Sequence, residues 1–430
     1  MAGVITVANR DGYAGATVSA VIAQAGVSRP TFYEYFADRD ACFLATLAAA
    51  SEQLLDLMRD AVTSAPPEQA TAATLAALID FAGSQPATAR FLLNEPLAAG
   101  RRALDARDWE LHEIERIIEG ARTELGGPSS APDIPIPILF GAIYRLLAAC
   151  LRRGDPSLSR VEEELTDWVA RYEQPASLRR WHALRPSPPP KSAPPALEPT
   201  LHEPAPLPPG RPRLAPEQVA EKHRQQILLA VARLADRKGY DATTIAEIAK
   251  LARVDARVFY TLFANKQDAF MSVHELGFQQ LMAITAGAFF EGETWPERSW
   301  RAGLAFARFL ETNPLIAHVG FIEAYAVGPR AAQRVEDSHM AFTMFLQEGY
   351  QFAPQADPPG RLALEAIVAA IFEIVYHEAR RGRTAQLSGM IGHMVFLFLT
   401  PFLGPQETNR FIHEQLQGER RGGSRRLAGP

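Results

Sequence analysis

The sequence predicts an all-α chain made of two copies of one pair of helical domains, joined by a proline-rich linker. Three observations support this prediction. Apolar residues recur at spacings of three and four along most of the 430 residues, which is typical of amphipathic helices. One residue pattern occurs twice at a nearly constant separation, and the segment between the copies contains too many prolines for a helix or a sheet interior.

The repeat is plainest in two short stretches, GVSRPTFYEYF at 26–36 and ARVDARVFYTLF at 252–263. Matched residues lie 227 positions apart in the first part of each copy and 228 apart further on. The matched pairs include Gly12 with Gly239, Tyr13 with Tyr240, Thr17 with Thr244, Phe32 with Phe259, Phe43 with Phe270, Phe81 with Phe309, Ile143 with Ile371, and Gly154 with Gly382. A period this long indicates two copies of a domain pair rather than a solenoid.

The segment between the copies, residues 183–216, reads ALRPSPPPKSAPPALEPTLHEPAPLPPGRPRLAP. Its proline density predicts an extended, partly polyproline II spacer with a rise of ~3 Å per residue. We therefore expect a linker with a reach on the order of 90 Å, ample to cross a domain. A ligand for a proline-recognising domain is the alternative.

Composition excludes several classes of function. The net charge of −5 means that any contact with nucleic acid must come from a local patch. The two cysteines, Cys42 and Cys150, lack metal-ligand spacing, and we expect buried free thiols in a reducing cytoplasm. No signal peptide is evident, and the apolar run at 394–403 is about half the length of a membrane span. The motifs of phosphate-binding loops, zinc proteases and serine hydrolases are missing, so no enzyme, metal or cofactor is expected.

The second copy contains a complete helix-turn-helix pattern. Residues 223–238 form an amphipathic segment that ends at Gly239. The residues Thr-Ile-Ala-Glu at 244–247 form a capping box at the start of a short second helix. After a turn at 253–254, Asp255 caps a third helix.

The third helix carries an aromatic stripe. Phe259 and Phe263 are four residues apart and should face the core, as should Phe32 and Phe36 in the first copy. Two short helices with a tight turn and such a stripe predict a helix-turn-helix. The residues Asn-Lys-Gln-Asp at 265–268 then begin a fourth helix, whose first amides together with the lysine offer a phosphate site.

The repeated pattern, G-Y-x-x-x-T-[VI]-x-x-[VI] followed by V-[SD]-x-x-x-F-Y-x-x-F-x-x-[KR], resembles the DNA-binding domain of TetR-type bacterial transcriptional repressors. The first copy reads GYAGATVSAVIAQAGVSRPTFYEYFADRD at 12–40. The downstream regions are similar to the ligand-binding, dimerising domains of that family, most closely in FIEAYAVGPRA and ARRGRTAQLSGMIGHMVFLFLTPFLGP. The resemblance covers nearly the whole chain apart from the linker.

This resemblance implies that the third helix of each copy lies in the major groove of DNA. Its outward residues would be Arg29, Pro30, Thr31 and Glu34 in the first copy, and Ala256, Arg257, Val258 and Thr261 in the second. Phosphate contacts would come from Thr17, Tyr33 and Arg39, and from Thr244, Tyr260 and Lys266. Arginine at 257 would favour guanine, and the glutamate at 34 could accept from a cytosine amino group.

The copies depart from the family pattern in three ways. Met1 aligns with Leu228, so either the true start lies upstream or the first helix of the first domain is truncated. Arg253 replaces the turn glycine Gly26, which costs ~1 kcal/mol if the backbone there is left-handed. Residues 1–45 carry three arginines against four acidic residues, a poor balance for a DNA-binding face.

The resemblance also implies a helical bundle with an apolar cavity after each DNA-binding domain. Dimerisation would use the last two helices, about 138–151 with 159–172 and about 361–381 with 385–403. Because the second pair is more apolar than one monomer needs, we expect the two copies to pack on each other as an intrachain pseudo-dimer. The linker would raise their effective concentration, and a higher oligomer is the alternative.

Candidates for the cavity lining are Phe306, Phe309, Phe321, Tyr325, Phe342, Phe345, Phe372 and Tyr376, with His318, Glu323, His339 and His377 as polar candidates. The expected effector is a small hydrophobic or aromatic molecule. The expected boundaries are 1–45 and 217–270 for the DNA-binding domains, 46–182 and 271–417 for the regulatory domains, 183–216 for the linker, and 418–430 for a disordered basic tail.

The function expected from these observations is a ligand-responsive DNA-binding regulator, a repressor, that acts as a pseudo-dimer. Because the outward residues of the two third helices differ, its operator would have two unlike half-sites. The alternative is a small-molecule sensor or interaction scaffold that has lost DNA binding.

Overall fold

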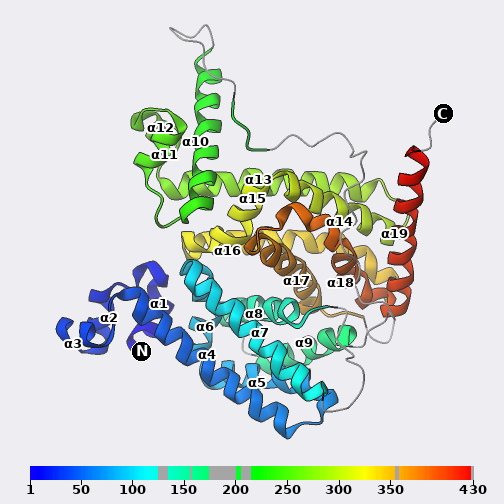
Figure 1. Cartoon of the computed structure of the whole chain (residues 1–430), viewed down its shortest axis with the longest axis horizontal. Coiled ribbons are helices and arrows are strands. Elements are labelled where there is room, and N and C mark those ends of the chain that lie inside the picture. The colour runs from blue at the N-terminus through cyan, green and yellow to red at the C-terminus, as the bar shows by residue number, and fades with distance from the viewer. Residues whose placement is uncertain (124–133, 155–156, 174–199, 205–214, 354–357, 428–430) are drawn as a thin grey trace. The chain divides into compact units, whose positions relative to one another are not determined.

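The computed structural model describes residues 1–123, 134–154, 157–173, 200–204, 215–353 and 358–427. Every regular element in these ranges is a helix (Figure 1), which confirms the predicted all-α class. The chain divides into two compact units. Unit 1 consists of Met1–Leu184, His339–Ile374 and Gly392–Arg421, and unit 2 consists of Arg185–Ser338, Val375–Ile391 and Gly422–Pro430.

The first repeat begins with three short helices followed by a long one, and continues as a bundle. Its elements are α1 (Ala2–Gly15), α2 (Val18–Ala25), α3 (Arg29–Tyr35), α4 (Arg39–Ser64), the 3-10 turn η1 (Pro67–Gln69), α5 (Ala70–Ser84), α6 (Pro86–Ala98), α7 (Arg101–Thr123), α8 (Ile136–Arg153) and α9 (Leu158–Glu173).

The second repeat follows the same order with a longer first helix and an interrupted middle. Its elements are α10 (Pro216–Lys238), α11 (Ile245–Ala252), α12 (Ala256–Leu262), α13 (Lys266–Phe290), α14 (Trp295–Thr312), α15 (Pro314–His318), the π-helical turn η3 (Val319–Glu323), the 3-10 turn η4 (Ala324–Val327), α16 (Pro329–Met340), the 3-10 segment η5 (Ala341–Gln351), α17 (Arg361–Arg380), the 3-10 turn η6 (Thr384–Met390), α18 (Ile391–Leu403) and α19 (Pro405–Leu427).

The backbone repeats as the sequence does. Except for Gly404, the residues with positive φ in the described ranges occur in matched pairs: Gly12 (73°) with Gly239 (86°), Gly26 (67°) with Arg253 (56°), Gly100 (78°) with Gly328 (129°), and Gly154 (68°) with Gly382 (67°). Glycine adopts this region without the steric cost that a Cβ imposes. The turns that end the helices are therefore set by the same residue type at the same place in both copies, with Arg253 as the exception.

Several boundaries differ from those expected. Helix α10 begins at Pro216, seven positions before the expected start at His223. Its counterpart α1 is shorter, with 14 residues against the 23 of α10. The expected domain boundaries at 45 and 270 fall inside α4 and α13. The backbone of α19 is helical to Leu427, although disorder was expected from 418. Most of the expected linker lies outside the described residues.

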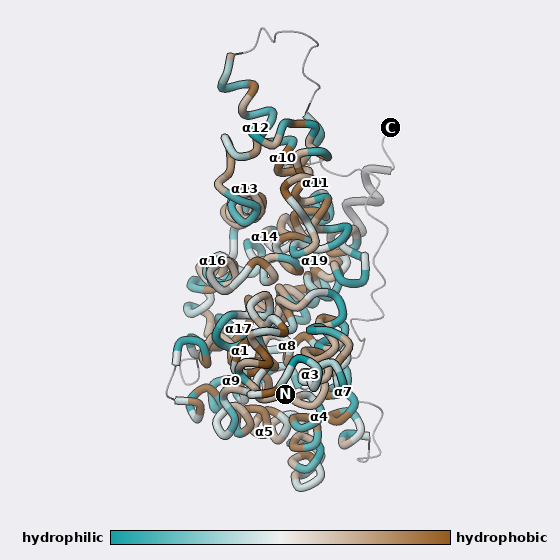
Figure 2. The backbone as a smooth tube through the Cα atoms, turned by 90° about the vertical axis from the view of Figure 1, so that its left-hand side faces the viewer, coloured by the Kyte–Doolittle hydropathy of each residue, from teal (hydrophilic) through white to brown (hydrophobic). Residues whose placement is uncertain are grey.

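The core of each unit consists of the apolar faces of its helices. In Figure 2, hydrophobic and hydrophilic stretches alternate along the helices, as amphipathic helices require. The largest fully buried side chains include Phe43, Phe91, Phe140, Trp168 and Tyr172 in unit 1, and Phe259, Phe270, Trp295 and Tyr376 in unit 2. The stretches 39–64 and 384–403 are long and apolar enough to cross a membrane, but 50% and 67% of their apolar windows are buried, a property that core helices share.

Unit 1 contains segments from both repeats. The hydroxyl of Tyr172 on α9 donates to the carbonyl of Leu397 on α18 at 2.9 Å. The amide of Leu362 at the start of α17 donates to Oε2 of Glu164 on α9 at 3.2 Å. Helices of the second repeat thus complete the packing of the first repeat within this unit.

Candidate nucleic-acid interface

The helix-turn-helix of the second repeat is held by caps at each helix start. At α11 the Glu247 amide donates to the Thr244 hydroxyl at 3.3 Å, and the Thr244 amide donates to the Glu247 carboxylate at 3.0 Å. The predicted capping box is therefore confirmed. At α12 the Asp255 carboxylate accepts from the Arg257 amide at 2.7 Å. Arg253, in the left-handed conformation, makes the turn between these two helices.

Helix α12 presents a polar face outward and one aromatic residue inward. Phe259 is fully buried, and Phe263 at the end of the helix is buried as well. The predicted outward residues Ala256, Arg257, Tyr260 and Thr261 are exposed, and Val258 is half-buried. The core stripe and the outward face thus separate as the helical period requires.

Helix α3 of the first repeat has the same division with different outward residues. Its cap is Ser28, whose hydroxyl accepts from the Thr31 amide at 3.2 Å. Phe32 is buried, but Phe36 is only half-buried, so its expected core role is weaker than that of Phe263. The outward residues Arg29, Pro30, Tyr33 and Glu34 are exposed, and Thr31 is half-buried.

Arg29 is the one outward residue of α3 whose head group contacts the preceding helix. Its Nη2 donates to Oγ of Ser19 on α2 at 3.0 Å. This bond links the guanidinium to α2. The remaining N–H groups of the guanidinium can still donate to a ligand.

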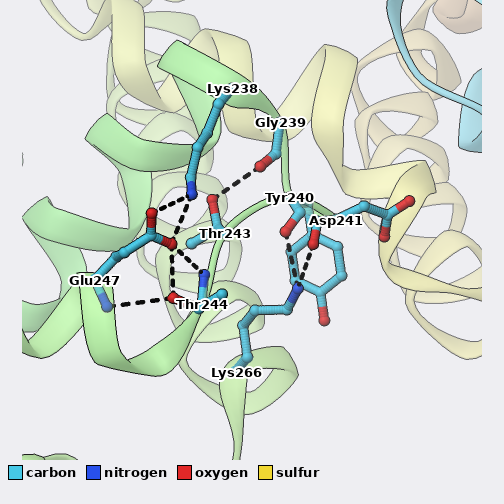
Figure 3. Close-up of polar contacts among 8 residues, drawn as sticks. All are labelled: Lys238, Gly239, Tyr240, Asp241, Thr243, Thr244, Glu247 and Lys266. Atoms are coloured by element: carbon cyan, nitrogen blue, oxygen red, sulfur yellow. Dashed lines mark hydrogen bonds and ion pairs between the residues drawn. The ribbon is translucent and has the colours of Figure 1, made fainter.

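The two cations expected at phosphates are both anchored to the tyrosine that precedes the second helix. Nζ of Lys266 donates to the carbonyls of Tyr240 at 2.9 Å and Asp241 at 3.4 Å, and it lies 4.0 Å from the centre of the Tyr240 ring. Figure 3 shows the side chain reaching these carbonyls. Burial lowers the pKa of Lys266.

Arg39 makes the matching contact in the first repeat. It donates to the Tyr13 hydroxyl at 2.9 Å, pairs with Asp40 at 3.1 Å, and stacks 4.3 Å from the centre of the Tyr13 ring. The sequence predicted both cations but not these anchors. The signal that could have revealed them is the repeated Gly-Tyr pair that precedes each second helix.

The N-termini of the two second helices differ in charge. Lys238 donates to both carboxylate oxygens of Glu247 at 2.6 Å, and this bond with the Thr244 bonds lowers the pKa of Glu247 to about 2 (Figure 3). In the first repeat Thr17 caps α2 by accepting from the amide of Ala20, the residue at the place of Glu247. A carboxylate therefore sits at the start of α11, whereas α2 has a small apolar residue there.

A glutamate at a matched position of the repeat bonds each DNA-binding domain to the bundle that follows it. The Tyr240 amide donates to Oε2 of Glu323 at 2.7 Å, and His318 lies 3.5 Å from both Glu323 and Asp236. In the first repeat the Tyr13 amide donates to Glu95, the residue 228 positions before Glu323.

Glu95 and Glu323 were not predicted in this role. Glu323 was expected to line the effector cavity, and instead its carboxylate contacts the turn of the DNA-binding domain. The matched positions of the two glutamates in the repeat were the available signal. Burial raises the pKa of Glu95 to about 7.

The predicted aromatic cavity residues are all buried, as are His339 and His377, whereas His318 and Glu323 are half-buried; these residues belong to different units. In unit 1, His339 stacks on Phe372 with ring centres 4.1 Å apart, and Phe342 meets Phe372 at 5.5 Å. Phe306, Phe321, Tyr325 and Tyr376 are buried in unit 2. Their role in effector binding stays a prediction. Both cysteines are buried and free, as predicted, and the described residues contain no cluster of His, Cys, Asp and Glu that could hold a metal.

Two segments of the chain match a known family model. The family model described as "Bacterial regulatory proteins, tetR family" matches residues 5–46 and 227–272. The first match covers α1 from residue 5, α2, α3 and the start of α4. The second covers the second half of α10, α11, α12 and the start of α13. A comparison with curated proteins gave no match.

Three solved structures match parts of the chain. The fatty acid degradation regulator FadR from Bacillus halodurans matches with a TM-score of 0.39 and 18% identity, over 45% of this chain and 99% of that one. A tetR-family regulatory protein from Rhodococcus RHA1 matches with a TM-score of 0.33 and 21% identity, over 40% and 97%. A TetR-family regulator from Marinobacter aquaeolei VT8 matches with 0.35 and 20%, over 43% and 96%.

The family assignment depends on the two family-model matches and on the geometry that they cover. Both matches fall on a capped helix-turn-helix with the same buried aromatic residue, and both are followed by a helical bundle. The two matched segments are TetR-type helix-turn-helix domains, so the chain carries two units similar to the bacterial regulatory proteins of the tetR family.

Proposed function

We propose that the chain is a cytoplasmic, ligand-responsive transcriptional repressor whose two repeats act as an intrachain pseudo-dimer on an operator with two unlike half-sites. The observation that carries this proposal is the difference between α3 and α12, the third helices of the two repeats. Both helices have a capped start and a buried phenylalanine, but their exposed residues differ almost throughout. Two helices that share a core but not an outward face are suited to read two different sequences.

The base contacts follow from the exposed side chains. Arg257 on α12 is exposed, and a bidentate contact from arginine to O6 and N7 selects guanine. Glu34 on α3 is exposed and can accept from the N4 amino group of cytosine. Pro30, Val258 and Thr261 offer apolar surface that fits a thymine methyl group.

The phosphate contacts would fix both helices in register without reading sequence. Tyr33 and Tyr260 are 50% and 60% exposed, so their hydroxyls are free to reach a backbone phosphate. Lys266 and Arg39 are held by their tyrosine anchors at the start of the fourth helix of each domain. Such anchoring lowers the entropy lost when a phosphate binds.

The pseudo-dimer is supported by the contacts within unit 1. Helices α17 and α18 of the second repeat bond to α9 of the first through Leu362 and Leu397, as described above. These three helices belong to the expected dimerisation pairs of the two copies. One chain would then present two DNA-binding domains, as two chains do in an ordinary dimer.

The effector side of the proposal depends on the buried aromatic residues and on the two linking glutamates. A hydrophobic or aromatic molecule among Phe306, Phe321 and Tyr325 would adjoin η3 and η4, the turns that follow α15. Glu323 ends η3 and accepts from the Tyr240 amide. Movement of this turn would therefore shift the hydrogen bond between Glu323 and the Tyr240 amide of the second DNA-binding domain.

Titration of the purified chain with genomic DNA fragments at several salt concentrations tests the proposal. A regulator that neutralises several phosphates loses affinity steeply as salt rises. Static light scattering on the same samples should give the mass of one chain, 47.2 kDa, in the absence of DNA. Binding that is absent at low salt would favour a sensor or scaffold instead, and a stable dimer as the sole species would contradict the self-contained pseudo-dimer.

A further inference from the structure

A buried ion-pair cluster in unit 1 joins the two repeats. Glu373 on α17 has a side-chain exposure of 0%, and its Oε1 accepts from Arg107 on α7 at 3.0 Å and from Arg145 on α8. The side-chain exposures of the two arginines are 2% and 10%. We name these three residues the charge cluster. Both cations come from the first repeat and the anion comes from the second.

The carboxylate also needs a glycine beside it. A Cβ built on Gly141 of α8 would lie 2.5 Å from Oε2 of Glu373 and 2.7 Å from its carboxyl carbon, closer than side chains tolerate. The absence of a side chain at Gly141 therefore makes the space that the carboxylate occupies.

Two residues of the charge cluster occupy matched positions of the two repeats. Helices α8 and α17 align at the 228 offset, and each is followed by a glycine with positive φ, Gly154 and Gly382. In this register Arg145 corresponds to Glu373 itself. Gly141 corresponds to Ala369, and Arg107 corresponds to Val335.

We propose that the charge cluster makes each repeat pair with the other repeat and prevents either from pairing with a second copy of itself. The inference rests on the pseudo-dimer of the proposed function and adds the residues that enforce it. Arg145 and Glu373 occupy one and the same position of the repeat, and they contact each other. In a symmetric pair of identical copies, that position would meet itself across the twofold axis.

A pair of first repeats would bring two Arg145 side chains together in a buried place. A pair of second repeats would bring two Glu373 carboxylates together, with Val335 in place of the arginine and the methyl group of Ala369 where the carboxylate needs space. Buried like charges strongly disfavour each other, and an unpaired buried charge is costly. Only the mixed pair has opposite charges and the glycine, so repulsion in the wrong pairs gives the specificity.

The test uses the full chain with a specific protease site inserted at 186–195, cut after folding. Native mass spectrometry and gel filtration then follow whether the two halves stay together. The variants are Arg145→Glu, Glu373→Arg and the double exchange of both. Gly141→Ala tests the space for the carboxylate, and Gly120→Ala on α7, where an added Cβ meets nothing within 4 Å, is its control.

We expect the cut wild-type chain to give a one-to-one complex of the halves and no pair of identical halves. Each single charge reversal should weaken the association by at least ~100-fold, as breaking a buried ion pair does. The double exchange should recover most of that loss, since opposite charges again meet. Gly141→Ala should weaken the complex, and Gly120→Ala should not.

Three results would overturn the inference: pairs of identical halves in amounts similar to the mixed pair, single reversals that leave the association unchanged, or a double exchange as weak as the single reversals. If circular dichroism shows that a reversal prevents folding, the neutral Glu373→Gln gives the same comparison with a smaller loss. Halves of the cut wild type that remain folded but separate would instead contradict the pseudo-dimer itself. DNA binding, measured apart, remains an independent test.

Discussion

Replacing Glu95 by glutamine should remove a loss of folding stability that unit 1 suffers as the pH rises. Glu95 on α6 accepts from the amide of Tyr13, at the junction between the first DNA-binding domain and its bundle. The residue as a whole is half-buried, but its Oε2 atom is buried without a hydrogen-bond partner. Glutamine keeps an acceptor for the Tyr13 amide and carries no charge, so it resembles the protonated carboxyl group.

The sign and size of the effect follow from the pKa. Burial raises the pKa of Glu95 from 4.5 to about 7, so the folded chain keeps a proton that the unfolded chain has released. The stability that this protonation contributes is complete below pH 4.5 and is lost as the pH rises through about 7. The rise from 4.5 to about 7, about 2.5 pKa units, corresponds to at most ~3.4 kcal/mol, at ~1.36 kcal/mol per unit. Because the residue is half-buried, we expect ~1–2 kcal/mol after solvent screening.

Calorimetric unfolding of the wild type and of Glu95→Gln at about pH 5 and about pH 8 measures this difference. The variant should match the wild type at the lower pH and be the more stable of the two at the higher pH. Glu52→Gln, a change at an exposed glutamate on α4, serves as the matched control and should show no such difference. A stability gap between Glu95→Gln and the wild type that is the same at both pH values would refute the reasoning.

Three further predictions concern the DNA-binding domains. Arg253→Gly should stabilise the second domain by ~1 kcal/mol, because φ there is 56°, and Gly26→Ala should destabilise the first by a similar amount; thermal unfolding that shows no change in either variant would contradict the strain. Lys266→Ala should weaken binding to all DNA sequences alike and reduce the salt dependence of the affinity by about one phosphate contact, as measured by anisotropy titrations. Tyr260→Phe should also weaken binding uniformly. A changed sequence preference in either variant would exclude a phosphate role. Arg257→Ala should relax the preference at one base pair by ~1–3 kcal/mol in one half-site only, as measured by competition with singly substituted sites; a loss spread over both half-sites would argue against direct reading.

The features that the sequence predicted correctly are those set by neighbours along the chain. The capping box at Thr244 and Glu247 and the inward phenylalanines on α3 and α12 depend on spacings of three and four residues. The repeat could be recognised because its glycine turns recur at one offset. By contrast, the start of α10 at Pro216 was missed because proline is common both in linkers and in the first turn of a helix.

The missed features depend on residues that are far apart in the sequence. The contacts of Glu95 and Glu323 with the tyrosine amides, and those of Glu373 with two arginines, join elements separated by tens to hundreds of residues. No local pattern marks a glutamate as one that will be buried against another helix. The repeat carries part of this information, because Arg145 and Glu373 occupy one position with opposite charges.

Selection of bound fragments from random DNA by the purified chain tests the central claim most directly. If α3 and α12 bind DNA together within one chain, the consensus should contain two half-sites of different sequence. Their centres should lie about one helical turn, or a simple multiple of it, apart. A perfectly palindromic consensus, or a footprint that covers a single half-site, would contradict the account.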